Sequence, residues 1–424
     1  MVFPGEAPDT ECKFSRDAGS VTRILDTTSR RHEESVKSLR PDLQPDKDFY
    51  VSYLGGKMEP SHTGKRARLN YIDLFCGGGG LSLGIHNASR FLGRDARLIV
   101  AADIDPIALS LVQSHFAPLV ARAKSVEDLV RYEADLSGGM EDFLVSPAFS
   151  DTQIAQFKGK IDLLVGGPPC QGHSNLNNRT RRFDPRNLLY LVMPAFAVGL
   201  KIPNIIIENV RNIHQAKEDV VGITKRILTN HGYHVQEAIL NASDFGVAQN
   251  RIRHFLVASR AGAPALDLMT RAFSGGPLTF DDACGDLHPL LDEKILENNG
   301  QLSGENISRV NYLHDNNLFE LPHEERPVCH QDDHTYPSVY GRIRGDMPMQ
   351  TVTTGFSSPG RGRFIHPYEK RTINIREAGR VQAFPDWYWK PAMEAGFKRA
   401  HFNKVIGDAV PSLLAYPLMA SLFA

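Results

Sequence analysis

Four short apolar runs recur between residues 71 and 207, and each is followed at once by glycine, proline or acidic residues. Stretches with helical spacing lie between them, as at 106–116 and 186–200. Near-continuous apolar strands that alternate with helices are typical of a parallel sheet covered on both faces. Ligands bind beyond the carboxyl ends of such strands, so we expect the four clusters to meet along one edge of one sheet. The runs and their clusters are Tyr71–Phe75 with 76–80, Leu98–Ala102 with 103–105, Ile161–Val165 with 166–171, and Ile205–Ile207 with 208–210.

The same rhythm predicts four segments. Residues 1–69 are rich in charge and poor in apolar periodicity, which favours a flexible or loosely docked N-terminal extension over a partner-binding arm. Residues 70–260 carry the strands and helices of an α/β domain. Residues 261–371 lose this alternation and predict a smaller, loop-rich domain, and residues 372–424 should return to complete the first domain.

Two local patterns refine this division. The runs His234–Leu240 and His254–Ser259, joined by a polar loop, are expected to form strands at the far edge of the sheet. A helix resumes near Thr372, where Asn374 and Glu377 have the spacing of a capping box.

The composition excludes several classes of protein. At 42% hydrophobic and 23% charged residues the chain has ordinary globular composition. No apolar run approaches the roughly 20 residues of a membrane helix, and the start shows no basic stretch before an apolar core, so we expect no membrane and no secretory signal. Five scattered cysteines favour a reducing compartment, without a disulfide framework or a metal.

The charges nearly cancel, because 48 Lys+Arg stand against 49 Asp+Glu. A neutral total would ordinarily argue against nucleic acid as partner, since phosphate binding is driven by clustered lysine and arginine. Arginines do cluster locally, at 179–186 and at 342–363. A charge run is usually a solvated face, so these clusters indicate DNA only alongside other motifs.

The glycines at 77–80 allow the backbone to approach a ligand without interference from Cβ atoms. Asp103 follows at close to the spacing of about 20 residues at which a carboxylate receives ribose hydroxyls. The turn lacks the full glycine pattern of dinucleotide folds, which favours an adenosyl ligand without a pyrophosphate. A purely structural tight turn remains the alternative.

Cys170 follows two glycines and two prolines, which stiffen the turn and fix the direction of the sulfur. A lone cysteine is usually a small buried hydrophobe, but a thiolate held in this way can act as a nucleophile. Glu208, at the end of a neighbouring strand, could then exchange a proton with the substrate. In the segment 249–253 a period of two puts Gln249, Arg251 and Arg253 on one face, which suits a carbonyl or phosphate ligand or a solvated edge strand.

Together these residues resemble the DNA (cytosine-5-)-methyltransferase family of the bacterial type. The resemblance covers about residues 70–260 and 372–411, with its motifs in the family's order. It implies a Rossmann-like methyltransferase domain with a mostly parallel sheet and an antiparallel edge strand, plus a target-recognition domain at 261–371. The matching motifs are Asp73–Gly80, Gly167–Ser174, Glu208–Val210, Gln249–Arg253, Arg376–Pro385 and Gly407–Val410, with a further match at Asp184–Leu188.

The resemblance implies S-adenosylmethionine as methyl donor, S-adenosylhomocysteine as product and no metal. Asp103 would bind the ribose hydroxyls and Asp135 would lie near the adenine amine. The positions implied to surround the cofactor are Asp73, Phe75, Cys76, Gly77, Gly78, Gly79, Leu81, Asp103, Ile104, Asp135, Leu136, Pro168, Asp408 and Val410.

The resemblance also implies the chemistry. Cys170 would attack C6 of the target cytosine, and Glu208 would hydrogen-bond N3 and the exocyclic amine. Arg253 would sit at the cytosine O2, and Arg251 would support the covalent step. The cytosine must be flipped out of the duplex, because these atoms are inaccessible inside it.

Double-stranded DNA is therefore the expected partner, in the bacterial cytoplasm near the nucleoid. The enzyme would either belong to a restriction-modification system, with a cognate restriction endonuclease that acts on the same site, or be a solitary methyltransferase. Arginines of the closing loop and of the second domain would line the DNA cleft, and Met349–Gly355 resembles the short shared core of that domain. The expected DNA contacts are Gln171, Ser174, Arg179, Arg181, Arg186, Gln249, Arg342, Arg344, Thr353, Arg361 and Arg363.

Two residues depart from the family pattern: Asp408 stands where Asn is usual, and His173 replaces a commonly aromatic or apolar residue. Two other activities stay open at this point. A tRNA-acting member is disfavoured by the long segment before residue 371 and by the absence of a Cys-Phe-Thr tripeptide. A catalytically silent DNA-binding relative is disfavoured by the intact site residues Cys170, Glu208, Arg251 and Arg253.

Overall fold

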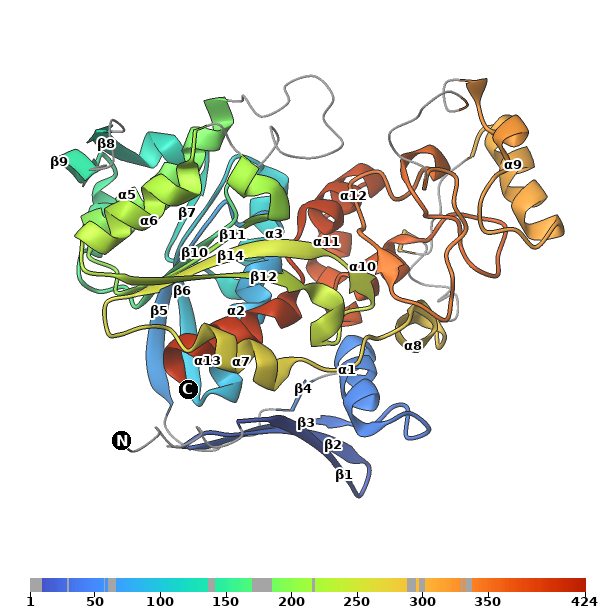
Figure 1. The fold of residues 1–424 in the computed structure, drawn as a ribbon, viewed down its shortest axis with the longest axis horizontal. Helices are drawn as coiled ribbons and strands as arrows, with labels where there is room; N and C mark the ends of the chain where they lie inside the picture. The colour runs from blue at the N-terminus through green and yellow to red at the C-terminus, as the bar shows by residue number, and fades with distance from the viewer. Residues whose placement is uncertain are drawn as a thin grey trace, which may run out of the picture.

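The computed structural model describes residues 10–28, 30–56, 58–59, 66–135, 142–169, 185–215, 218–287, 295–296, 302–328, 331 and 338–424. At its centre is a seven-stranded sheet in the order β12-β14-β11-β10-β5-β6-β7 (Figure 1). The neighbours from β11 to β7 pair in parallel. The fold is therefore mixed α/β with a mainly parallel sheet, as the sequence predicts. These strands are β5 (Ala67–Leu74), β6 (Arg94–Asp103), β7 (Val120–Ala123), β10 (Leu163–Gly166), β11 (Asn204–Val210), β12 (His234–Asn241) and β14 (Ile252–Ser259).

One detail of the sheet differs from the prediction. β14 is antiparallel to both β11 and β12, so the antiparallel strand lies one position in from the edge. β12 forms the edge itself. The strands β5 and β6 are also longer than their apolar runs, because backbone pairing from Ala67 with Arg94 continues through polar residues.

Helices cover both faces of the central sheet, and two hydrophobic cores result. Successive residues of β10 alternate between them: Leu163 and Val165 face one core, and Leu164 faces the other. The first core is covered by α2 (Gly80–Phe91), α3 (Pro106–Phe116), α7 (Leu266–Phe273) and α13 (Ala415–Phe423). The second is covered by α4 (Thr152–Ala155), α5 (Val192–Leu200) and α6 (Val220–Asn230), beside a two-stranded sheet of β8 (Val130–Asp135) and β9 (Asp142–Phe149).

The N-terminal residues form an ordered layer, where the sequence favours a flexible or loosely docked extension. Four antiparallel strands and one helix lie beneath the central domain (Figure 1). The sheet buries one face, as the alternating burial of β2 and β3 shows. The elements are β1 (Cys12–Asp17), β2 (Ser20–Asp26), β3 (Arg31–Lys37), α1 (Pro45–Gly55) and β4 (Met58–Glu59).

A buried ion pair lies at the centre of this layer. Arg23 Nε donates to Glu34 Oε1 over 2.8 Å, and the two side chains are only 2% and 3% exposed. The guanidinium also lies 3.8 Å from the ring centre of Tyr416 and 4.8 Å from that of Phe49. Tyr416 belongs to α13, so the pair joins the N-terminal layer to the last helix of the chain.

The region between β14 and residue 371 is loop-rich, as predicted, and has a small core of its own around Val310, Leu313, Val339 and Ile365. Its first helix belongs elsewhere, however. Ala265 N donates to Ser421 O over 3.0 Å, so α7 packs on α13. The first helix after the predicted boundary therefore packs in the first core. The remaining elements here are β13 (Gln249–Asn250), α8 (Phe280–Cys284), α9 (Gly304–Asp315) and β15 (Met349–Gln350).

The return segment begins with the predicted capping box. Asn374 Oδ1 accepts from Glu377 N over 2.8 Å, and Glu377 Oε2 accepts from Asn374 N over 2.8 Å. The helices of this segment are α10 (Ile375–Val381), α11 (Lys390–Glu394), α12 (Arg399–Asp408) and α13. Short 3-10 helices occur at Val126–Leu129, Pro185–Leu191, Arg211–Gln215, Ala242–Phe245, His323–Glu325, Pro359–Arg361, Asp386–Trp389 and Ser412–Leu414.

One helical run in the described part of the chain, Arg399–Phe423, is long and apolar enough to cross a membrane by those two measures alone. Its apolar window is 89% buried inside the fold. Such burial is typical of a core helix, and this run packs on the central sheet through α13.

We predict that Arg23→Met destabilises the protein by about 3–5 kcal/mol, because Glu34 is left buried without its partner. Urea unfolding followed by circular dichroism measures this loss. The control is the double variant Arg23→Met/Glu34→Met, which removes both charges and should be the more stable of the two. A single variant as stable as the wild type would contradict the importance of the pair.

Candidate active site

The carboxyl ends of four parallel strands lie side by side, as predicted. β10 pairs with β11 on one side and with β5 on the other, and β5 pairs with β6. The loops after β5 and β10, and the ends of β6 and β11, therefore share one edge of the sheet. This edge brings together the glycine loop, Asp103, the Gly167–Pro169 turn and Glu208.

The glycines after β5 have two different functions. A Cβ at Gly78 would lie 2.1 Å from Val405 Cγ1, and one at Gly80 would lie 2.4 Å from Val410 O. At Gly79 it would lie 2.7 Å from Tyr388 Oη. These three glycines are thus required by packing against the return segment. Gly77, with φ +49, has no described atom within 4 Å of its Cβ position, so it alone faces open space.

The end of β6 offers a fixed carboxylate beside an exposed apolar side chain. Asp103 Oδ2 accepts from Gly77 N over 2.8 Å, and Oδ1 accepts from Asp105 N over 2.8 Å. Burial raises the pKa of Asp103, while these backbone hydrogen bonds oppose the shift. Ile104 is 73% exposed although it directly follows the strand.

Several predicted cofactor residues lie beneath the loop. Asp73 is 1% exposed, and its Oδ2 accepts from Ser82 Oγ over 2.6 Å. Cys76 and Leu81 are buried in the first core. Their side chains do not face the open edge, and they hold the loop on α2. The sequence-based prediction instead places them around the cofactor.

Asp135 is a second difference. It ends β8 in the separate two-stranded sheet. The strand that pairs with β6 is β7, and its end places Ala123 opposite Asp103. The topology therefore does not bring Asp135 to this edge, and Leu136 lies outside the described residues.

The remaining cofactor positions lie at the edge. Phe75 has a positive φ of 57 as the chain leaves β5. Pro168 is buried, and its carbonyl accepts from Asn209 Nδ2 over 3.1 Å. Val410 is half-buried against Gly80.

Asp408, the departure from the family pattern, lies in an ion-pair cluster. Its Oδ2 is 3.0 Å from Lys404 Nζ, which is also 3.7 Å from Asp105 Oδ2. Burial alone would lower the pKa of Lys404, but the two aspartates raise it. Lys404 thus neutralises Asp408 beside the end of β6.

The Glu208 carboxylate lies against the turn that precedes Cys170. Its Oε1 is 2.8 Å from Arg253 Nε, and a Cβ on Gly167 would lie 2.9 Å from its Oε2. Glu208 is 8% exposed, and the side chain of Arg253 is 13% exposed. Glu208 and Arg253 are therefore brought together.

Arg251 and Gln249 bind other parts of the chain than Glu208. Arg251 donates through its two terminal nitrogens to Val352 O over 2.9 Å and Gly407 O over 3.1 Å. Gln249 is fully buried and donates to Gln382 Oε1 over 3.0 Å. The chain changes partner here, since β13 pairs with β15 before β14 joins the central sheet. Gln249 is consequently not placed to contact DNA, and Arg251 positions two segments of the chain.

The nucleophile and the closing loop lie outside the described residues. This applies to Cys170, Gln171, His173, Ser174, Arg179 and Arg181. Arg186 lies in the 3-10 helix Pro185–Leu191, and the position of its side chain is not described.

The comparisons agree with this geometry. The sequence profile of the family described as C-5 cytosine-specific DNA methylase matches residues 69–424. The chain belongs to that family. The N-terminal layer precedes the matched range.

Individual relatives give the same result. The Type II methyltransferase M1.BsuMI of Bacillus subtilis is 38% identical over 369 residues, which cover 87% of this chain and 83% of the relative. M.XorII of Xanthomonas oryzae pv. oryzae is 30% identical over 379 residues, covering 81% and 82%. A solved DNMT2 variant of Spodoptera frugiperda has a TM-score of 0.53 at 16% identity, covering 84% of this chain and all 100% of its own, which shows a shared fold.

The open edge of this methylase fits S-adenosylmethionine. A carboxylate held at Asp103, the exposed apolar Ile104 and the open backbone at Gly77 offer partners for ribose hydroxyls, a flat ring and polar end groups.

The arginines predicted for the DNA surface separate into two kinds. Arg344 and Arg361 are exposed. Arg342 is 6% exposed and donates to Asn317 Oδ1, and Arg363 donates to the carbonyls of Phe319 and Arg342. Arg363 therefore holds the loops of the methylase together rather than facing DNA. Thr353 is half-buried where Gly407 packs on its carbonyl carbon.

One group in the described residues has the spacing of a metal site: His214, Glu237 and His254, with ligand atoms within 4.8 Å of one another. Lys225 Nζ already forms an ion pair with Glu237. Hydrogen bonding from His254, with a contribution from Lys225, lowers the pKa of Glu237 to about 2. Lys225 thus neutralises Glu237 through Oε1, while both histidines contact Oε2.

The sequence-based prediction missed Lys404 and Tyr388. Tyr388 Oη donates to Gly78 O over 2.7 Å and so fixes the glycine loop. Lys404 lies four residues before Asp408 on the same helix, and this i, i+4 spacing was the available signal.

We predict that Asp73→Asn stabilises the protein increasingly as the pH rises from about 4 to 7. Burial raises the pKa of Asp73 from its ordinary value of 3.8 to about 7. Between these values the folded state keeps a proton that the unfolded state loses, so wild-type stability falls with rising pH. The asparagine variant has no such dependence.

The measurement is the free energy of urea unfolding of both proteins over that pH range. Glu394→Gln, an exposed carboxylate on α11, is the control and should follow the wild type. Parallel curves for wild type and Asp73→Asn would show that Asp73 does not titrate in this window.

Proposed function

We propose that this protein is a sequence-specific DNA methyltransferase that moves a methyl group from S-adenosylmethionine to C5 of a cytosine flipped out of duplex DNA. The observation that carries the proposal is the Glu208–Arg253 pair. It lies against the Gly167–Pro168 turn, on the sheet edge that also holds Asp103.

The cofactor would lie across the ends of β5 and β6. Asp103 would accept from the ribose hydroxyls with the lone pairs that its two backbone hydrogen bonds leave unused. Ile104 would cover one face of the adenine, and the backbone at Gly77 would approach the amino-acid end. S-adenosylmethionine, when bound, supplies an electrophilic methyl group.

The chain's own residues would make the cytosine reactive. C5 of cytosine is a poor nucleophile until a group adds at C6. Cys170 would form a bond to C6 as a thiolate, while Glu208 hydrogen-bonds N3 and the amine and stabilises the developing charge. C5 then bonds to the methyl group, loses its proton, and the bond from C6 to Cys170 breaks.

Arg253 explains how Glu208 is held before the cytosine enters. The guanidinium bonds Glu208 Oε1 through Nε and the carbonyl of Ile252 through Nη1. Guanidinium has five donors, so it can bind the cytosine O2 with the others while it keeps the carboxylate in place.

The DNA would bind between this edge and the loop-rich region before residue 371, which we propose to be the target-recognition domain. Arg251 links the two, because its donors reach Val352 in that region and Gly407 in the return segment. The loop at 170–184 would close over the flipped base. The high similarity to Type II methyltransferases supports a role in restriction-modification, with a cognate endonuclease as partner, in the bacterial cytoplasm.

We predict that Cys170→Ala abolishes methyl transfer and that Glu208→Gln reduces its rate by about 10²–10⁴-fold, because each removes one half of the activation at C6. The measurement is transfer of tritiated methyl from S-adenosylmethionine to plasmid DNA, with bisulfite sequencing to locate the product. Glu394→Gln on α11 is the control and should keep wild-type activity.

Two outcomes would contradict the proposal. Methyl transfer undiminished in Cys170→Ala would reject the covalent route. Labelling of tRNA but not of DNA by the wild-type protein would reject DNA as substrate.

We predict that Asp408→Asn changes the affinity for S-adenosylmethionine by less than about tenfold, since Lys404 already neutralises the aspartate and exposed ion pairs contribute about 0–1 kcal/mol. Lys404→Met should weaken binding more, because it leaves Asp408 and Asp105 uncompensated beside the cofactor edge. Isothermal titration calorimetry measures both. Equal losses in the two variants would show that Asp408 itself bonds the cofactor.

A further inference from the structure

A cavity of about 500 Å³ lies in the loop-rich region, away from the edge that holds Glu208. It is lined by residues from the end of α9 and from three loops of that region. The residues that matter here are His314, Asn317, Phe319, Arg342, Arg344 and Tyr368.

Two arginines are oriented by one aromatic ring in this cavity. The guanidinium carbons of Arg342 and Arg344 lie 4.4 and 4.3 Å from the ring centre of Phe319. Arg342 Nη2 also donates to Asn317 Oδ1 over 2.8 Å. A guanidinium that packs on a ring keeps its N–H donors free in its own plane, so both groups are arranged to receive acceptors.

Polar atoms in the lining lack partners among the described residues. Arg342 is 6% exposed, and its Nε is buried without a hydrogen-bond partner there. His314 Nε2 is also buried without a hydrogen-bond partner among the described residues. A buried donor without an acceptor costs about 1–3 kcal/mol, and guanidinium can only donate. The ligand of this cavity must therefore be rich in acceptor atoms.

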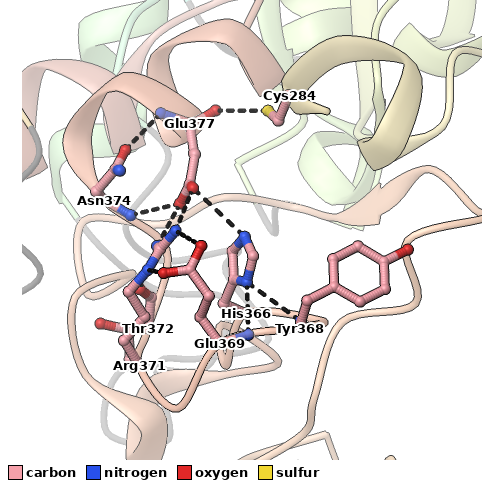
Figure 2. Close-up of polar contacts among 8 residues, drawn as sticks. All are labelled: Cys284, His366, Tyr368, Glu369, Arg371, Thr372, Asn374 and Glu377. Carbon is pink, nitrogen blue, oxygen red and sulfur yellow. Dashed lines mark hydrogen bonds and ion pairs between the residues drawn. The ribbon is translucent and has the colours of Figure 1, made fainter. Parts of the chain in front are cut away.

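Polar contacts hold the loop that carries the cavity residue Tyr368, as Figure 2 shows. His366 Nδ1 accepts from the backbone nitrogens of Tyr368 over 3.2 Å and Glu369 over 3.0 Å. Its Nε2 lies 3.4 Å from Glu377 Oε1. Arg371 bonds both Glu369 and Glu377, so the loop is fixed to α10. One wall of the cavity is thus tied to α10 by hydrogen bonds and ion pairs.

We propose that this cavity binds a backbone phosphate of the duplex DNA substrate, an inference that rests on the proposed function. A phosphate is the outermost group of a duplex and can enter a concave site, whereas base edges lie recessed in the grooves. Phe319 cannot serve as a stacking platform for a base, because the two guanidiniums lie on it. Two oriented guanidiniums match the acceptor oxygens of a phosphodiester.

Two acidic residues oppose this charge, and one of them, Asp281, accepts from Tyr368 Oη over 2.5 Å beside the cavity. Asp346 lines the same cavity and is exposed. Its carboxylate would repel a phosphate, so its removal should strengthen binding. This gives the proposal a variant with a gain of affinity, which general damage to the fold cannot produce.

The test is binding of a short fluorescein-labelled duplex by fluorescence anisotropy over a series of salt concentrations. Each phosphate contact contributes a slope of about −0.9 to log K against log salt. We expect Arg344→Met to bind more weakly and with a slope less steep by about one. Asp346→Asn should bind more tightly. Arg271→Met, an exposed arginine on α7, is the matched loss of charge outside the cavity and should follow the wild type.

Arg342→Met should reproduce the effect of Arg344→Met, with thermal unfolding to confirm that the variant is folded. Bisulfite sequencing of methylated plasmid libraries should show the same target preference in Arg344→Met as in the wild type. A preference relaxed at one base position would overturn the proposal in favour of base recognition. An unchanged salt slope in Arg344→Met would also overturn it.

Failure of the proposed function gives a different result. In that case the wild-type protein transfers no methyl group to DNA, whereas the slopes of the binding curves still report on the cavity.

Discussion

The active-site edge depends on a seam where backbone meets backbone at glycine. Gly78, Gly80 and Gly84 of the segment after β5 approach Val405, Val410 O and Ser412 O so closely that a Cβ would lie 2.1–2.4 Å away. A Cβ on Gly407 would likewise lie 2.2 Å from Thr354 N. Residues distant in sequence therefore pack at positions where only glycine fits. The glycine loop keeps its shape because the last fifty or so residues of the chain close on it.

Buried polar side chains complete this seam. Gln249 accepts from Val352 N over 2.7 Å and donates to Gln382, which itself donates to Ile406 O. Arg251 joins Val352 to Gly407. Satisfied networks of this kind are costly to disrupt, because each lost partner leaves a buried group without a hydrogen bond. They fix the loop-rich region relative to the catalytic edge through the strand β13.

Much of the fold follows from local patterns that tertiary packing does not override. The helix α3 matches its predicted bounds, and the meeting of four strand ends follows from parallel pairing alone. The N-terminal layer did not follow, since Arg23 and Glu34 occupy inward positions of β2 and β3. Because Arg23 and Glu34 are charged, the sequence of these strands lacks the apolar alternation of half-buried strands. The segment is therefore predicted to be polar. Only the pairing of these strands shows that the two charges neutralise each other in a core.

The candidate site was predictable in part for a similar reason. Glu208 and Asp103 end strands, so their place follows from the topology. Gln249 and Arg363 were assigned to DNA by residue type, but their burial depends on segments far away in sequence. The placing of Asp135 beside the adenine stays a prediction, because the β8–β9 pair lies outside the central sheet and spacing along the chain does not reveal this.

The direction of β14 has a consequence for how the acid and the guanidinium meet. Because β14 runs against its neighbours, its first residues lie where the parallel strands finish, and Arg253 pairs with Val210. The opposing strand directions place Glu208 of β11 and Arg253 of β14 next to each other on one face of the sheet. A slip of one residue in this pairing would turn Arg253 to the opposite face and bring Ile252 or His254 toward Glu208. The chemistry of the edge thus depends on the register of two strands as much as on the identity of the side chains.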